Sequence, residues 1–168
     1  MLFRSPKYVD YCRDISRSGK SLLSIIADIL DMSQIEAGRI RIDKRPLILN
    51  EVIETSVDQV RTDADAKNIR IITDLAADSN LIADKRSMVR ILSHLLHNAV
   101  KYTPESGRIT VRTREVSGAI NLFVEDTGRG IPKDILPNIG KPFAWVGLDP
   151  TKPADGSGLG LEIGRAHV

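Results

Sequence analysis

The spacing of apolar positions along the chain changes once, near residue 39. Between residues 6 and 37 apolar side chains recur with a helical period, with Ile15, Leu22 and Ile29 seven residues apart. This spacing predicts one long amphipathic helix, and Gly38 stands where a helix commonly ends. The apolar stripe is too wide for a solitary helix, so it either pairs with a partner helix or packs on the chain's own domain.

From residue 39 onward, short alternating segments are interspersed with helical ones. Alternation of apolar and polar residues indicates strands, and cap residues mark helix starts. The predicted elements are a strand at "RIRI", a helix over 46–66 capped near Asn50, a strand over 68–75, a strand and a long helix over 81–103 capped at Asp84, a hairpin of 108–116 and 119–126 about Ser117 and Gly118, and a short helix over 131–139.

Helices mixed with neighbouring antiparallel strands predict a two-layer α/β sandwich whose sheet is covered on one face. The length of 168 residues suits one domain plus an appended element. Hydrophobic residues make up 42% of the chain and aromatic residues only 4%, so the core is expected to be aliphatic.

Charge and cysteine content exclude several classes of protein. A net charge of +2 gives no concentrated basic character, so no nucleic-acid partner is expected. The single cysteine, Cys12, excludes an internal disulfide framework. No apolar run reaches the roughly 18 residues of a membrane span and no signal-peptide pattern is present, so this region is expected to be soluble and cytosolic.

Three stretches carry candidate chemistry. His94, Asn98 and Lys101 stand at i, i+4 and i+7 on the long predicted helix and share one face. An imidazole, an amide and an amine in one row can hold a metal-bound polyphosphate, although a solvated stripe is the plainer alternative.

By contrast, "SGKS" at residues 18–21 lacks the first glycine of a phosphate-binding P-loop and lies in a helical pattern, so no phosphate site is expected there.

The second stretch is "VEDTGRGIP", in which Asp126 ends a predicted strand and Gly128 and Gly130 permit a tight turn. A carboxylate held there can accept a hydrogen bond from an exocyclic amino group. The third is the glycine-rich "DGSGLGLEIGRAHV", whose backbone N–H groups can approach an anion at a helix start. The second stretch alone is more often an ordinary tight turn, and the third alone is also a weak signal.

In this order and spacing, "HNAVKYTPESG", "DTGRGIP", "KPFAWVG" and "GSGLGL" resemble the N, G1, F and G2 boxes of sensor histidine kinases. These kinases belong to the wider GHKL ATPase group that includes gyrase, Hsp90 and MutL. "LLSIIADILDMSQIEAGRIRI" resembles the second helix of their dimerisation domain, continuing into the ATP-binding domain. The resemblance implies a dimerisation helix over 6–38 and a GHKL-type ATP-binding domain over 39–161, lacking its C-terminal strands.

The resemblance also implies roles for single residues. Asn98 would coordinate the Mg²⁺ that bridges the ATP phosphates, Lys101 would lie near those phosphates, and Tyr102 would lie beside the nucleotide. Asp126 would accept from the adenine amino group in a pocket shaped by Gly128 and Gly130. The implied lid and phosphate-loop residues are Phe143, Gly156, Gly158, Leu159 and Gly160. The chain departs from the family at His94, where many members carry a second asparagine.

The implied function is that of a histidine kinase fragment. In the complete protein Mg²⁺·ATP would phosphorylate a histidine on a first dimerisation helix, and the phosphoryl group would pass to a response-regulator receiver domain. That helix and its histidine are not among residues 1–168, so the chain alone is expected to be inactive. Residues 1–5 and 162–168 are expected to be non-native scars, because "LFRS" and "EIGRAHV" can be back-translated in frame into sequencing-adapter DNA.

Two alternatives remain open at this point. The chain could belong to a non-catalytic signalling scaffold that keeps the nucleotide-binding fold. It could also belong to a gyrase- or Hsp90-like ATPase, but those enzymes carry a glutamate base four residues before the asparagine, where this chain has His94.

Overall fold

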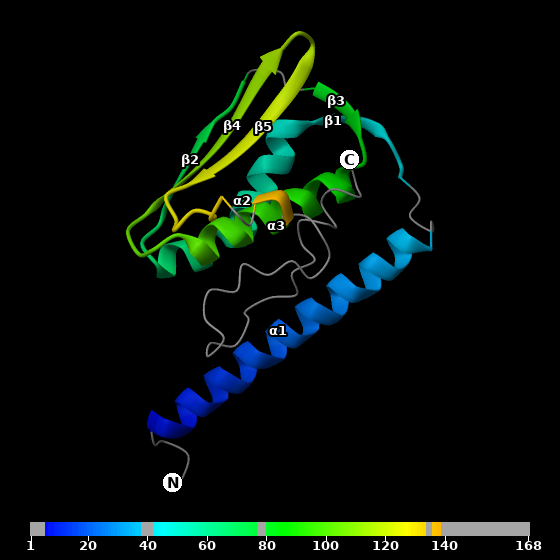
Figure 1. The fold of residues 1–168 in the computed structure, drawn as a ribbon. Helices are drawn as coiled ribbons and strands as arrows, with labels where there is room; N and C mark the ends of the chain where they lie inside the picture. The colour runs from blue at the N-terminus through cyan, green and yellow to red at the C-terminus, as the bar shows by residue number, and fades with distance from the viewer. Residues whose placement is uncertain (1–5, 38–41, 77–79, 134–135, 139–168) are drawn as a thin grey trace.

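The computed structural model describes residues 6–37, 42–76, 80–133 and 136–138 (Figure 1). Helices and strands are mixed along this part of the chain. In order, the elements are α1 (Pro6–Glu36), β1 (Arg45–Ile48), α2 (Leu49–Ala66), β2 (Arg70–Asp74), β3 (Asn80–Ala83), α3 (Lys85–Tyr102), β4 (Arg108–Val116), β5 (Ala119–Asp126) and the 3₁₀ turn η1 (Leu136–Asn138).

The principal sheet has the strand order β2-β4-β5. Strands β4 and β5 form the predicted antiparallel hairpin, and its two turn residues Ser117 and Gly118 have φ values of 54° and 78°. Two consecutive positive φ angles are typical of the tight turns that suit twisted hairpins. Strand β2 pairs with β4 in parallel, a pairing that the sequence analysis did not predict. The crossover through β3 and α3 makes this parallel pairing possible.

The stretch before α2 differs from the prediction. Residues Arg45–Ile48 form β1, which pairs antiparallel with β3, and the helix begins at Leu49. Ile48, not Asn50, is the N-cap residue, and it makes no side-chain cap hydrogen bond. Pairing with β3 therefore outweighs the apolar spacing that favoured a longer helix. The short helix predicted over 131–139 is also wrong at its start, because residues 131–133 are not helical.

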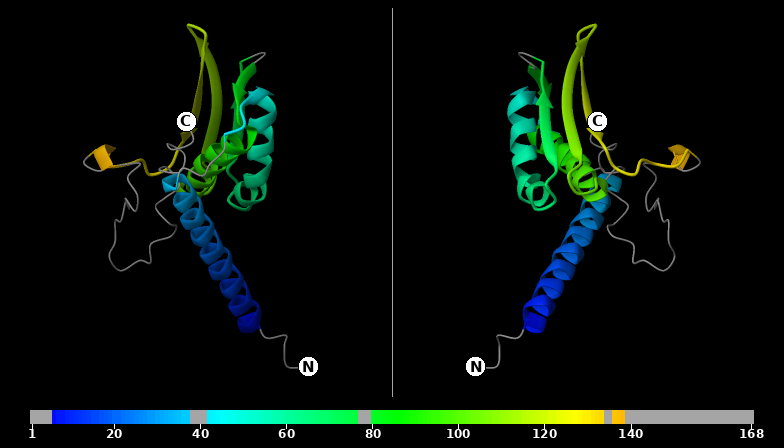
Figure 2. Two further views of the ribbon diagram at one scale, coloured as in Figure 1. Left: turned by 90° about the vertical axis from the view of Figure 1, so that its right-hand side faces the viewer. Right: turned by 90° about the vertical axis from the view of Figure 1, so that its left-hand side faces the viewer.

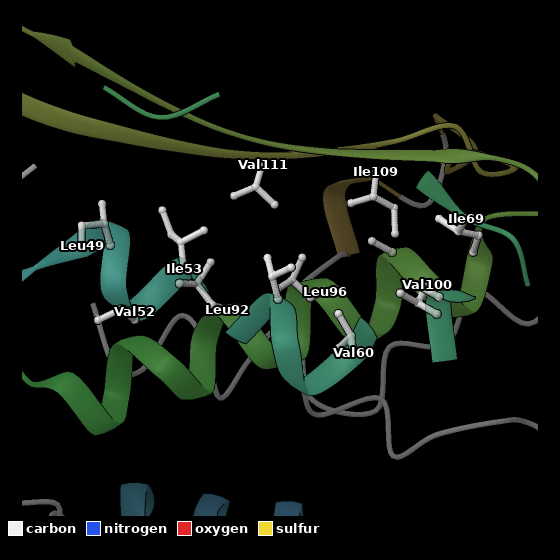
Figure 3. Close-up of a cluster of buried hydrophobic side chains, with 13 residues drawn as sticks. Leu49, Val52, Ile53, Val60, Ile69, Leu92, Leu96, Val100, Ile109 and Val111 are labelled. Atoms are coloured by element: carbon white, nitrogen blue, oxygen red, sulfur yellow. The ribbon is translucent and has the colours of Figure 1, made fainter. Parts of the chain in front are cut away.

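An aliphatic core fills the space between the helices and the sheet. Helices α2 and α3 pack against each other and cover one face of β2-β4-β5 (Figure 2). Side chains from α2, α3 and β4 meet between these layers (Figure 3). The core comprises Leu49, Val52, Ile53, Val57, Val60, Ala64, Ile69, Leu92, Leu96, Ala99, Val100, Ile109 and Val111. The two-layer α/β sandwich is thereby confirmed.

Helix α1 extends away from this sandwich (Figures 1 and 2). Its apolar stripe is exposed, with Ile15 72% and Leu22 59% accessible. The alternative in which the stripe packs on the chain's own domain is therefore wrong for these side chains. "SGKS" is helical, as expected. None of the helices in the described residues has the length and apolar character that crossing a membrane requires.

Candidate functional site

Helix α3 is the platform of the candidate site, and Asp84 fixes its start as predicted. The Asp84 carboxylate accepts from the backbone N–H of Ser87 at 2.8 Å and from that of Asp43 at 2.9 Å. The hydrogen bond from Ser87, and then that from Asp43, holds the pKa of Asp84 below its usual value. Asp84 thus caps α3 and ties it to the segment before β1.

One face of α3 packs into the hydrophobic core, and another face bears the predicted site residues. Leu92, Leu96 and Ala99 are buried against the sheet, whereas His94, Asn98 and Lys101 are half-buried. The sharing of a helix face by His94, Asn98 and Lys101 is confirmed by the uninterrupted helix. Tyr102 lies four residues after Asn98, one turn further along the same face, and is 40% exposed.

The last turn of α3 is held by Lys67, a residue that the sequence analysis did not single out. Its ammonium donates to the carbonyl oxygens of Val100 at 2.7 Å, Lys101 at 3.0 Å and Thr103 at 3.1 Å. Final helix carbonyls have no intrahelical donors, so a cation there satisfies groups that burial would otherwise penalise. No local signal marks Lys67, because its partners lie 33 to 36 residues away along the chain.

Asp126 ends β5 and begins a compact turn. Its Oδ1 accepts from the N–H of Gly128 at 2.8 Å, which orients the carboxylate. Between them, Thr127 extends the pairing with β4, since its N–H donates to the carbonyl of Arg108 at 3.0 Å. Gly130 has a φ of 68°, a conformation that favours glycine. The tight turn predicted at these glycines is confirmed.

Gly128 brings this turn against the end of α3. A Cβ added at Gly128 would lie 2.7 Å from the carbonyl oxygen of Tyr102 and 3.1 Å from its carbonyl carbon. Any larger side chain would push the turn away from the helix. Because Gly128 has no side chain, the turn after Asp126 can pack against the end of α3 at Tyr102, 26 residues earlier in the chain.

The Tyr102 ring has two cations close by. The Lys101 ammonium lies 5.1 Å from the ring centroid, and the Arg129 guanidinium carbon lies 4.8 Å from it. Both distances are within the range of cation–π attraction, which restrains an exposed ring. Arg129 is a second site residue missed in the sequence, because the variable position between two turn glycines carries no local signal.

The structure thus brings together Asn98, Lys101, Tyr102, Asp126 and Gly128 at one end of α3. Five other predicted site residues lie outside the described residues, so their placement stays a prediction: Phe143, Gly156, Gly158, Leu159 and Gly160.

The donor set suits Mg²⁺ bound chiefly by a nucleotide. Within the described residues, no group of three His, Cys, Asp or Glu side chains could enclose a metal ion. Mg²⁺ in nucleotide sites commonly takes one or two protein oxygens and completes its shell with phosphates and water. The Asn98 amide oxygen has the chemistry of such a ligand, and Lys101 adds positive charge one turn away.

Comparison with known proteins places this geometry in a family. Residues 83–168 match the family described as histidine kinase-, DNA gyrase B-, and HSP90-like ATPase. The non-motile and phage-resistance protein of Caulobacter vibrioides is 39% identical over 96% of this chain, and the histidine protein kinase DivJ of the same organism is 33% identical over 98%. The chain spans only 20% and 28% of these two curated relatives.

Solved structures show the same fold. Full-length ShkA, in complex with AMPPNP, has a TM-score of 0.76 at 25% identity, covering 96% of this chain and 34% of that one. Histidine kinase ThkA, in complex with the response regulator protein TrrA, has a TM-score of 0.69 at 23% identity, covering 83% of this chain and 41% of that one.

The family match begins at Ala83, one residue before the cap of α3, and includes every residue of the candidate site except Lys67. The fold, the converging N- and G1-type motifs and the named relatives agree: the chain belongs to the histidine kinase-, DNA gyrase B- and HSP90-like ATPase family, and its relatives there include histidine kinases.

Proposed function

We propose that the site at the end of α3 binds Mg²⁺·ATP as the catalytic domain of a sensor histidine kinase. In the complete protein, the γ-phosphoryl group passes to a histidine of the dimerisation region and then to an aspartate of a response regulator. The ATPase family implies ATP binding, and the finer assignments of metal, acceptor and partner are part of this proposal.

One observation carries the proposal: the contact of Gly128 with the Tyr102 carbonyl, which joins the Asp126 turn to the helix bearing Asn98. A nucleotide needs both parts at once, an acceptor for its base and cationic and amide groups for its phosphates. The AMPPNP complex of ShkA supports the choice of an adenine nucleotide, because AMPPNP is an ATP analogue.

Each residue then has a definite role. Asp126 accepts from the adenine amino group, and Tyr102 lies beside the base. Asn98 contributes an oxygen to Mg²⁺, which neutralises phosphate charge when bound, and Lys101 lies near the phosphates. Phe143 belongs to a lid, and the loop with Gly156, Gly158, Leu159 and Gly160 closes over the phosphates. Positioning and charge neutralisation account for most of catalysis in such transfers.

The proposed partners follow from the same assignment. Helix α1, within residues 6–38, pairs with a second copy of the protein through its exposed stripe. The receiving protein is a response-regulator receiver domain, a choice supported by the complex of ThkA with TrrA.

Asp126 provides the sharpest test of adenine recognition. Asp126→Asn keeps an oxygen for the Gly128 N–H but replaces the second acceptor by an NH₂ donor facing the adenine amino group. We expect ATP and ADP affinity to fall together by roughly 30- to 150-fold, since a hydrogen bond to a charged group contributes about 2–3 kcal/mol. Calorimetric titration measures this loss. The unsubstituted protein should bind GTP poorly, and equal affinity for GTP and ATP would remove this role from Asp126.

Phosphotransfer separates the kinase from the rival scaffold. The chain of 168 residues should bind ATP without becoming phosphorylated. Its histidines are His94 and His97, which lie on α3 itself without an in-line approach to a γ-phosphate, and His167, which belongs to residues 162–168 that are expected to be non-native. The protein with its upstream dimerisation region should form acid-labile phosphohistidine with γ-labelled ATP. ATP binding without phosphohistidine in that longer protein would favour the scaffold, and label on His94 or His97 would refute the architecture.

A further inference from the structure

Lys67 is the C-cap residue of α2, yet its side chain serves another helix. Its ammonium donates to three carbonyl oxygens at the end of α3, those of Val100, Lys101 and Thr103, at 2.7 to 3.1 Å. An ammonium has three N–H donors, so these carbonyls match its full donor capacity. The side chain is half-buried, which limits screening of its charge by water.

The Lys67 ammonium lies where the helix dipole would otherwise disfavour a bound anion. The carboxyl end of a helix carries partial negative charge, and proteins usually bind anions at the opposite end. In the site proposed above the order is reversed, because Asn98 and Lys101 lie in the last two turns of α3. A polyphosphate held by them would approach the negative end of the helix dipole.

We propose that Lys67 is a charge-compensating, positioning residue of the nucleotide site. It cancels the negative end of α3 and so permits a nucleoside polyphosphate to bind beside that end, without itself contacting the ligand. The proposal rests on the proposed nucleotide-binding function and adds a requirement of its own. The effect of the Lys67 charge must grow with the charge on the ligand, from adenosine through Mg²⁺·ADP to Mg²⁺·ATP.

Lys67→Gln tests the charge separately from the hydrogen bonds, because its amide keeps two N–H donors for the carbonyls. We expect affinity to fall about tenfold for Mg²⁺·ATP, about threefold for Mg²⁺·ADP and by less than about twofold for adenosine, as expected for the loss of a unit charge near the phosphates. Lys67→Arg, which keeps the charge, should restore ATP affinity. Lys85→Gln removes the same charge from the exposed start of α3 and should change none of the three affinities.

The outcomes separate this proposal from the proposed function. Equal losses of affinity for all three ligands in Lys67→Gln would show that Lys67 has a purely structural role. Unchanged ATP affinity would show that Lys67 has no role in binding. Either result overturns the proposal for Lys67 and leaves the proposed function standing. A parent protein that binds neither ATP nor ADP refutes the proposed function and this proposal with it.

Folding of the variant does not limit the test, because the Lys67 ammonium can be followed in the unsubstituted protein by ¹⁵N NMR. Three hydrogen bonds should slow its proton exchange enough for detection. We expect its resonance to shift with Mg²⁺·ATP and not with adenosine. An ammonium resonance whose chemical shift is unchanged at saturating Mg²⁺·ATP would overturn the proposal.

Discussion

Asn98 shows how a single amide becomes informative through its neighbours. It lies four residues before Tyr102 on a face that is half-buried, between the core side of α3 and solvent. An asparagine in that place is ordinary until the Asp126 turn is packed against the same helix end. The case for Asn98 as a site residue therefore depends on the contact between Gly128 and the Tyr102 carbonyl, in which Asn98 takes no part.

Asn98→Ala should weaken Mg²⁺·ATP binding roughly tenfold or more, because a contact with a charged group contributes about 1.5–3 kcal/mol. The fold should be unaffected, since the side chain is not part of the core. Titration with ATP, with and without Mg²⁺, measures the effect, which should be largest with Mg²⁺ present. Asn121→Ala, on an exposed position of β5, is the matched control. Equal Mg²⁺·ATP affinities for Asn98→Ala and the parent would exclude Asn98 as a ligand.

At the scale of elements, α3 is fixed at both ends by side chains from outside the helix or at its boundary. Asp84 caps its start, and Lys67 holds its final carbonyls. Between these ends, Leu92 and Leu96 anchor the helix in the core. A helix restrained in this way presents its polar face in one orientation, which a binding site built on that face requires.

Asp84→Ala should lower the free energy of unfolding by about 1 kcal/mol at neutral pH, the usual contribution of an N-cap. Because the pKa of Asp84 is lowered in the folded state, its stabilisation is present above the unfolded-state value and is lost as pH falls through the lower folded-state value. The difference between parent and variant should therefore shrink below about pH 4. Urea denaturation across this range measures it.

Asp63→Ala, at an exposed position within α2, is the control and should show neither the loss nor its pH dependence. A parent-to-variant difference for Asp84→Ala that stays constant down to about pH 2 would contradict the assignment of the carboxylate as the cap.

At the scale of the whole molecule, the sandwich buries an apolar core of its own, whereas α1 leaves its apolar stripe exposed. Among the described residues, the core side chains come from α2, α3, β4 and Ile69, which precedes β2, whereas Ile15, Leu22 and Ile29 of α1 are all exposed. Heptad spacing with an exposed apolar face is typical of a helix that pairs with another.

We expect the protein to self-associate through α1. Introducing Leu22→Lys and Ile29→Lys together should shift it to the monomer, because charges on the shared face oppose pairing. Sedimentation equilibrium at several concentrations measures the change. Ala27→Lys adds a lysine on the opposite side of the heptad and should leave association intact. Association that persists unchanged in the double variant would place the contact elsewhere.

Local signals in the sequence determined much of this protein. Helical spacing predicted α1 and α3, the Asp84 cap was correct, and alternation about Ser117 and Gly118 predicted the hairpin. Asn98 and Asp126 could also be proposed as candidate site residues, because the residues around each of them match a motif. These features depend on backbone preferences and interactions within a few residues, which a linear sequence records directly.

Only the tertiary structure decided the remaining features. The parallel pairing of β2 with β4, the strand at Arg45–Ile48 and the reach of Lys67 to Val100 each join segments far apart in the chain. Their free energy comes from pairing and from satisfying carbonyls that have no local partner, and it exists only after the chain has folded. For that reason the sequence could nominate candidate site residues, but it could not indicate Lys67, whose partners lie 33 to 36 residues away.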